Sequence, residues 1–101
     1  MIVYSVTVNV DESVHNDWLN WMKTKHIPDV MATKLFNSYR FLKVLSRNEG
    51  EEGHTYNIQY SCTDMKTLER YQSNHATELQ KEHTDRYKNK FVAFRTLLEE
   101  A

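Results

Sequence analysis

The sequence predicts an α+β sandwich in which two helices cover one face of a four-stranded antiparallel sheet, in the order β-α-β-β-α-β. Three observations carry this prediction. Residues 2–10 alternate with period two, two longer stretches have apolar residues at helical spacing, and both glycines of the chain lie in the polar segment 48–53. The 101 residues are enough for one domain, which we expect to span 1–101.

The first half of the chain begins with a strand. Residues 2–10 are rich in β-branched side chains, which favours a strand as strongly as their alternation does. Asp11 lies where a helix N-cap belongs, and apolar residues then recur every three or four positions, which predicts an amphipathic helix with an aromatic face. We expect Pro28 to end or kink this helix, because the residue before a proline is disfavoured in α geometry. A short second helical piece should follow.

The second half contains the other three strands. Residues 38–47 and 54–62 are predicted to form a hairpin, and the two glycines suit a loop that needs positive φ angles. Asp64 is expected to cap a long second helix, and Asn89 to end it in a left-handed conformation. Residues 90–98 are predicted to form the last strand, which is apolar on both faces.

This order of elements is the split β-α-β, or ferredoxin-like, plan. Right-handed crossovers place both helices on the same face of the sheet and make the first and third strands central. The outer face of the central strands is polar but uncharged, whereas 38–47 and 90–98 have no fully polar face. A contiguous apolar area on an outer sheet face usually indicates a partner, so we expect a homodimer joined through the sheet face.

Composition excludes several classes of protein. Thirteen Lys and Arg against fourteen Asp and Glu give a net charge of −1, which argues against a nucleic-acid partner. The longest apolar runs are only a few residues, so no membrane span is expected, and the absence of Lys and Arg from residues 1–10 argues against a secretory signal. The single cysteine, Cys62, fits a reducing, cytoplasmic location.

Three segments resemble a known family: YSVTVNVDESVHNDWLNWM near the start, then HIPDVMATKLF, and KFVAFRTLL near the end. The chain resembles small bacterial proteins of unassigned function in the dimeric α/β-barrel superfamily, most specifically in its W-x-x-W-M and H-I-P-D-V-M motifs. The resemblance implies a ferredoxin-like protomer whose sheet pairs with that of a second copy. Lys34 stands where a glycine is expected, and a left-handed backbone there would cost roughly 1 kcal/mol relative to glycine.

A few polar residues on otherwise apolar faces are candidates for chemistry. His26 and His75 lie on helical stripes that face the sheet, although a core histidine held by a hydrogen bond would fit the same pattern. Arg95 lies within an apolar strand, where its guanidinium needs an anionic ligand, another acceptor, or an edge strand that lets it reach water. We predict a shared pocket in which His26 and His75 are catalytic proton carriers and Arg95 binds an anionic group. The other predicted ligand-binding residues are Trp18, Trp21, His83 and Asn9.

Three classes of function fit this sequence. The first is a homodimer that binds a small anionic or aromatic molecule between helices and sheet, as a cofactor-free oxygenase or isomerase. The second is a haem-binding or haem-degrading relative. Asn9 and His75 resemble two positions that such proteins use, but no Trp follows the third strand. The third is a non-catalytic assembly or regulatory module. The sequence requires no cofactor, and it disfavours a metal site because it has neither an H-x-x-x-H nor a C-x-x-C motif.

Overall fold

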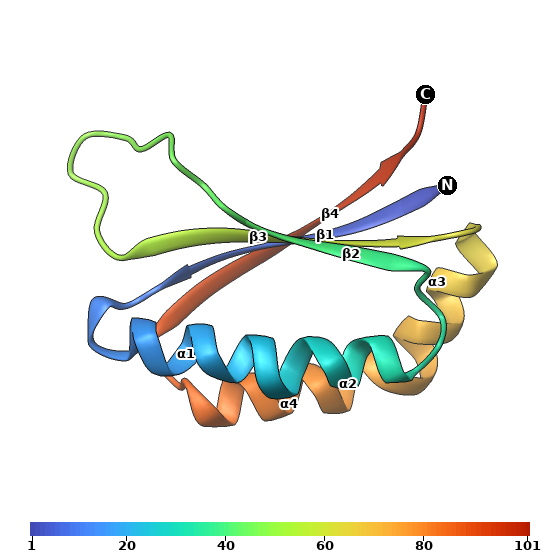
Figure 1. The fold of residues 1–101 in the computed structure, drawn as a ribbon, viewed down its shortest axis with the longest axis horizontal. Coiled ribbons are helices and arrows are strands. Elements are labelled where there is room, and N and C mark those ends of the chain that lie inside the picture. The colour runs from blue at the N-terminus through green and yellow to red at the C-terminus, as the bar shows by residue number, and fades with distance from the viewer.

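The computed structural model describes residues 1–101 and confirms the ferredoxin-like plan, with four antiparallel strands in the order β2-β3-β1-β4. The helices all lie on one face of this sheet (Figure 1). As predicted, the first and third strands are central. The strands are β1 (Ile2–Val10), β2 (Ser38–Lys43), β3 (His54–Cys62) and β4 (Phe91–Glu99).

Strand boundaries agree with the sequence-based expectation to within one residue except in β2. This strand ends at Lys43, four residues before the predicted end at position 47. The chain then turns away, because the Arg47 guanidinium donates hydrogen bonds to the backbone oxygens of Glu51 and Gly53 at 2.9 and 3.0 Å and so folds the loop back on itself. Both glycines have the positive φ that the sequence predicts, 80° at Gly50 and 75° at Gly53.

The first helical stretch does not end at Pro28 but continues past it, and the predicted short second piece is present as the last part of this stretch. It begins with a short 3-10 turn, η1 (Glu12–Val14), and runs through α1, η2 and α2. η2 is a π-helical turn in which the N–H of Ile27 donates to the carbonyl of Met22, five residues earlier. Pro28 then lies in the first turn of α2, directly after the π turn, a position in a helix that favours proline. The three segments are α1 (His15–Trp21), η2 (Met22–His26) and α2 (Ile27–Ala32).

The second helical stretch also contains a π-helical turn. It consists of α3 (Met65–Tyr71), η3 (Gln72–Ala76) and α4 (Thr77–Arg86). The Asp64 carboxylate caps α3 as predicted, accepting a hydrogen bond from the backbone N–H of Thr67 at 2.9 Å. Lys34 and Asn89 follow the two stretches in left-handed conformation, each with φ of 64°.

The extra residue in η3 changes which side chains face the sheet. Tyr71 is buried, and the next buried residue on this stretch is Ala76, five positions later. A regular α-helix would have brought His75 inward at the four-residue spacing. The π turn therefore moves the inward-facing position from His75 to Ala76.

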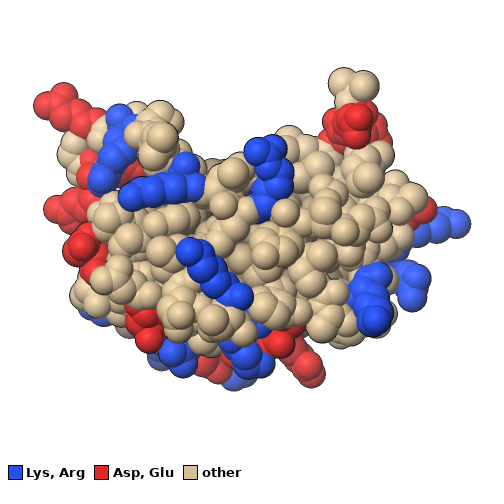
Figure 2. All heavy atoms as spheres, viewed as in Figure 1, with Lys and Arg blue, Asp and Glu red and all other residues tan.

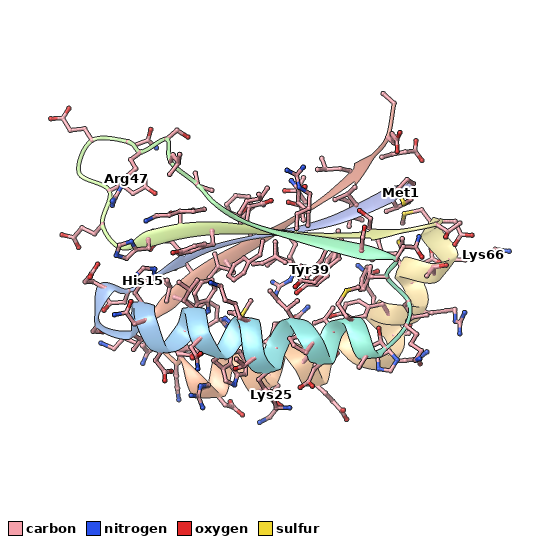
Figure 3. All side chains as sticks on the ribbon, viewed as in Figure 1. Met1, His15, Lys25, Tyr39, Arg47 and Lys66 are labelled. Atoms are coloured by element: carbon pink, nitrogen blue, oxygen red, sulfur yellow. The ribbon has the colours of Figure 1, made fainter.

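The core lies between the sheet and the helices, where side chains from both layers fill the space (Figure 3). Trp18, Leu68 and Cys62 are completely buried there. Tyr39, on the β2 edge, points into the same layer but remains about half exposed (Figure 3). Every helix of the structure is too short or too polar to cross a membrane.

The outer face of the sheet carries few charged side chains. In Figure 2 this face forms a saddle between the hairpin and the C-terminal end of β4, whereas the helices below it carry many charges. Its central polar side chains bond to one another, with the Asn57 amide donating to Ser5 and Thr7 at 2.8 and 3.0 Å. On β4, three apolar side chains of this face stay largely in solvent: Val92 is 69%, Phe94 61% and Leu98 45% exposed.

Candidate functional site

A cavity of about 170 Å³ lies between the sheet and the helices. An apolar cavity of roughly 150 Å³ holds benzene, so this one has room for one six-membered ring with small substituents. Thr84 and Arg95 line it and are both exposed, which places its opening between α4 and β4. No Asp, Glu or Lys lines the cavity. Its polar lining residues are the three buried tyrosines Tyr4, Tyr60 and Tyr71, together with His26, Gln80, His83, Thr84 and Arg95.

Arg95 lies at the opening of the cavity. It pairs with Val6 across the sheet, on the face covered by the helices. Its Nε donates a hydrogen bond to the Tyr4 hydroxyl oxygen at 2.9 Å, and this is its only side-chain hydrogen bond within the protein. It takes part in none of the ion pairs of the structure. A guanidinium with free N–H donors beside an apolar cavity is suited to an anionic group of a ligand.

His83 is buried on α4, with its ring against that of Phe91 at a centroid distance of 4.4 Å. Trp18 Nε1 donates a hydrogen bond to His83 Nε2 at 2.9 Å. Burial lowers the pKa of His83 to about 4, helped by the nearby His26 and Arg95. The ring is therefore neutral at pH 7.

The ring of His26 lies edge-on against that of His83, with ring centroids 5.7 Å apart, and both residues line the cavity. Its other side stacks on Trp21 at a centroid distance of 5.2 Å. Burial lowers the pKa of His26 to about 4, against the smaller opposing effect of Asp29. Its Nδ1 is buried and has no hydrogen-bond partner, so no contact at Nδ1 fixes which ring nitrogen carries the proton.

Three tyrosines form the part of the cavity around the Arg95 contact. The ring of Tyr4 lies 6.3 Å from that of Tyr60 and 5.8 Å from that of Tyr71, between centroids. Burial raises the pKa of Tyr60 and Tyr71, so both hydroxyls keep their protons and can donate hydrogen bonds. Gln80 also reaches the Tyr4 hydroxyl, at 3.4 Å. Together with Arg95, these groups make the cavity rich in donors and poor in acceptors.

The structure brings three of the predicted site residues to one cavity: His26, His83 and Arg95. The two tryptophans were predicted as a ligand wall, but neither lines the cavity. Trp18 and Trp21 instead lie behind the two histidines and hold their rings in place.

His75 and Asn9 lie elsewhere. His75 does not line the cavity, contrary to the predicted shared pocket, because η3 turns Ala76 inward in its place. Asn9 is on the outer face of the sheet, where its amide donates to Thr55 Oγ1 at 3.0 Å and to the Glu52 carbonyl at 2.9 Å. The pair that would serve haem thus lies on opposite faces of the sheet and cannot contact one ligand.

Sequence reasoning missed the polar lining residues Tyr4 and Gln80. The alternation of residues 2–10 puts Tyr4 on the apolar face of the first strand, but nothing local indicates that its hydroxyl meets a residue 91 positions away. Gln80 has a polar side chain, so no apolar spacing points to it. The pairing of β1 with β4 is the information that would have joined Tyr4 to Arg95.

The fold and the cavity together define a ferredoxin-like protein with a ligand-sized cavity between its two layers. A family model described as "Domain of unknown function (DUF4286)" matches residues 1–101, and the chain belongs to this family. No curated protein matches the chain.

Solved structures with the same fold differ strongly in sequence. An ethyl tert-butyl ether D (EthD) family protein from Bacillus halodurans has a TM-score of 0.73 at 11% identity, with 100% of both chains covered. SnoaB, a cofactor-independent oxygenase from Streptomyces nogalater, has a TM-score of 0.66 at 11% identity over 98% of this chain and 92% of its own. A dimeric ferredoxin-like protein from an uncultured marine organism has a TM-score of 0.65 at 14% identity over 99% of this chain and 96% of its own. At these identities the similarity shows the fold alone.

Proposed function

We propose that this protein binds a small organic anion with a single ring in the cavity between helices and sheet, and that it transfers a proton on that molecule without a cofactor. The observation that carries the proposal is the Arg95 guanidinium, which has no anionic partner at the opening of a cavity without carboxylates. A cation in such a place is stabilised by an anion brought in by the ligand.

The character of the ligand follows from the size and chemistry of the lining. The volume of about 170 Å³ suits one ring, and the absence of lining carboxylates leaves no group that would repel an anion. The protonated hydroxyls of Tyr60 and Tyr71 add hydrogen-bond donors for an oxygen of the ligand.

His26 is the proton carrier in this proposal. Its ring is neutral at pH 7, because burial lowers its pKa to about 4, and it can therefore accept a proton. A negative charge that develops on the ligand would raise this pKa toward the usual value and favour the transfer. One structure with the same fold is a cofactor-independent oxygenase, so this scaffold supports chemistry without a cofactor in another protein.

Binding is tested with benzoate and phenylpyruvate, each of which carries one carboxylate and one ring. Isothermal titration calorimetry at pH 7 should detect both. Arg95→Gln should weaken them about 10- to 100-fold, since a hydrogen bond to a charged group contributes roughly 1.5–3 kcal/mol. Arg70→Gln is the matched control, because Arg70 is exposed on α3, lies away from both the cavity and the outer face of the sheet, and takes part in no ion pair. Equal affinity in wild type and Arg95→Gln, or no binding at millimolar concentration, would contradict the proposal.

Proton transfer is tested separately on bound phenylpyruvate. Proton NMR in D₂O should show exchange of the C3 hydrogens for deuterium, about 100-fold or more faster than without protein. In this exchange the neutral His26 ring removes a proton from C3 and leaves an enolate. The imidazolium then exchanges that proton for a deuteron from D₂O and returns the deuteron to C3. His26→Gln should retain binding and lose the exchange. Exchange at the uncatalysed rate in the wild type would rule out His26 as a proton carrier and leave only a binding protein.

We further propose that the protein is a homodimer in which the outer faces of two sheets pack together. The exposed Val92, Phe94 and Leu98 support this arrangement, because each would be removed from water. One structure with the same fold is described as dimeric. Sedimentation at micromolar concentration should show a dimer that Phe94→Glu dissociates and that Met65→Glu, an exposed residue at the start of α3, leaves intact. A wild-type monomer would refute it.

A further inference from the structure

We infer that Trp18 fixes the tautomer of His83, so that Nδ1–H of this neutral ring is a hydrogen-bond donor toward an acceptor oxygen of the ligand. The identity of the ligand rests on the proposed function, whereas the tautomer does not depend on any ligand. Trp18 is then a positioning residue, since it lies outside the cavity and acts through His83.

The tautomer follows from the chemistry of the indole. Trp18 Nε1 carries a hydrogen and has no lone pair to offer, so it can only donate. Its partner at 2.9 Å, Nε2 of His83, must therefore be the unprotonated nitrogen. In a neutral imidazole the single proton then lies on Nδ1.

The orientation of the His83 ring is equally constrained. Rotating the ring by half a turn would put Cε1 in place of Nε2 and leave the indole N–H without an acceptor. Trp18 is completely buried, so that N–H could not turn to water instead. Leaving a buried donor unpaired is costly, and the observed orientation is the one that avoids it.

The Nδ1–H group of His83 is left for the ligand. No hydrogen bond within the protein uses it, although His83 lines the cavity. A neutral imidazole that donates in this way can stabilise an oxygen on which negative charge develops. His26 differs, because it has no hydrogen bond that fixes its proton. The two histidines thus have separate roles, His26 as the proton carrier and His83 as a fixed donor.

The separate roles of His26 and His83 narrow the class of ligand. Arg95 contacts the cavity at its opening, and His83 packs on Phe91, four residues earlier on the same strand. Four residues of a strand span about 13 Å along the backbone, and the long Arg95 side chain, whose charge acts on the His83 ring, shortens the gap between the two donor groups to one that a single substituted ring can bridge. The ligand class is a ring with a carboxylate at one end and a hydrogen-bond acceptor, such as a carbonyl oxygen, at the other.

The tautomer is measured directly by long-range ¹H–¹⁵N NMR of the free protein, which separates Nδ1–H from Nε2–H rings. His83 should be the Nδ1–H form, and a coupling across the hydrogen bond should join His83 Nε2 to Trp18 Nε1. In Trp18→Phe, His83 should become a mixture of the Nδ1–H and Nε2–H forms. Trp21→Phe removes an indole that makes no hydrogen bond to His83, so His83 should keep the Nδ1–H form. A wild-type His83 in the Nε2–H form, or no coupling, overturns the inference whether or not Trp18→Phe folds.

Ligand preference tests the second half of the inference. The wild type should bind 4-formylbenzoate, with an acceptor opposite the carboxylate, about tenfold more tightly than 4-aminobenzoate, with a donor there. Trp18→Phe should lose this preference and keep the requirement for Arg95. If neither benzoate binds, the proposed function fails while the NMR result still decides the tautomer. Tighter binding of 4-aminobenzoate would show that His83 accepts and overturn the inference alone.

Discussion

Lowering the pH from 7 to 5 should destabilise this protein strongly through the two buried histidines. Burial lowers the pKa of both His26 and His83 to about 4, from an ordinary value of 6.5 that the unfolded chain regains. Between these values the unfolded state binds protons that the folded state does not. The free energy of unfolding therefore falls as the pH drops below 6.5, and the loss is complete below pH 4.

The magnitude follows from the two pKa values of each ring. At pH 5 each histidine is almost fully protonated in the unfolded chain and about nine-tenths neutral in the folded one, which costs roughly 2 kcal/mol per ring relative to pH 7. The pair therefore removes about 4 kcal/mol, a large part of a typical stability of about 5–15 kcal/mol. Burial also lowers the pKa of His15, which adds a loss of the same sign.

Urea unfolding followed by tryptophan fluorescence, at constant protein concentration, measures this loss at pH 7 and pH 5. The double variant His26→Gln/His83→Gln should lose about 4 kcal/mol less than the wild type over this interval. Glutamine can still accept the Trp18 hydrogen bond and does not titrate. His75→Gln, a matched change outside the cavity, should leave the wild-type loss in place. An equal loss in wild type and double variant would show that neither buried ring controls acid stability.

Three further predictions concern the backbone and are read from the same unfolding curves. Lys34→Gly should stabilise the protein by roughly 1 kcal/mol, because φ of 64° at Lys34 is strained for a residue with a side chain. Gly53→Ala should lower the free energy of unfolding more than Gly50→Ala does. A Cβ at Gly53 would lie 2.6 Å from the Val10 carbonyl oxygen, whereas a Cβ at Gly50 would meet no other atom within 4 Å. Equal losses in the two variants would refute this close approach. Asp64→Ala should remove the cap of α3 and cost about 1 kcal/mol, and an unchanged urea midpoint would contradict this.

The sheet was the most predictable part of the molecule. Strand residues at 2–10 and 54–62 alternate so regularly that pattern and structure agree to the residue. Hydrophobic alternation fixes which side faces the core, because a shift by one residue would reverse every side chain. Two other local signals were also correct. Asp64 was predicted as a helix cap, and Gly50 and Gly53 were predicted in a turn that needs positive φ angles.

The helices were less predictable, because both contain a π turn that no local pattern marks. Pro28 indicates an end or a kink in the first helix, and the structure has the π turn η2 directly before it, after which the helix continues as α2. In the second helix, a four-residue period predicts that His75 and His83 share a face. The inserted residue in η3 breaks that period, so that only His83 reaches the cavity.

The candidate site could be predicted only in part. Arg95 in an apolar strand and His26 on a helical stripe were indicated by the sequence, and both line one cavity; their roles remain predictions. The Tyr4–Arg95 and Trp18–His83 hydrogen bonds join residues 91 and 65 positions apart. Contacts of that kind depend on how the layers pack, which a single sequence does not encode in any local spacing.

The extra residue in η3 sets the orientation of every side chain that follows it on this helical stretch. Regular α-helical winding through the same residues would rotate the downstream side chains by about 100°, since an α-helix turns that far per residue, and would take His83 and Gln80 off the cavity wall. Deleting one residue within η3 would have the opposite outcome. Tyr71 and Ala76 would then be four positions apart, which is the inward-facing spacing of an α-helix, and α4 would keep its present face toward the cavity. The π turn is thus a place where the length of the chain can change by one residue while the cavity wall stays the same.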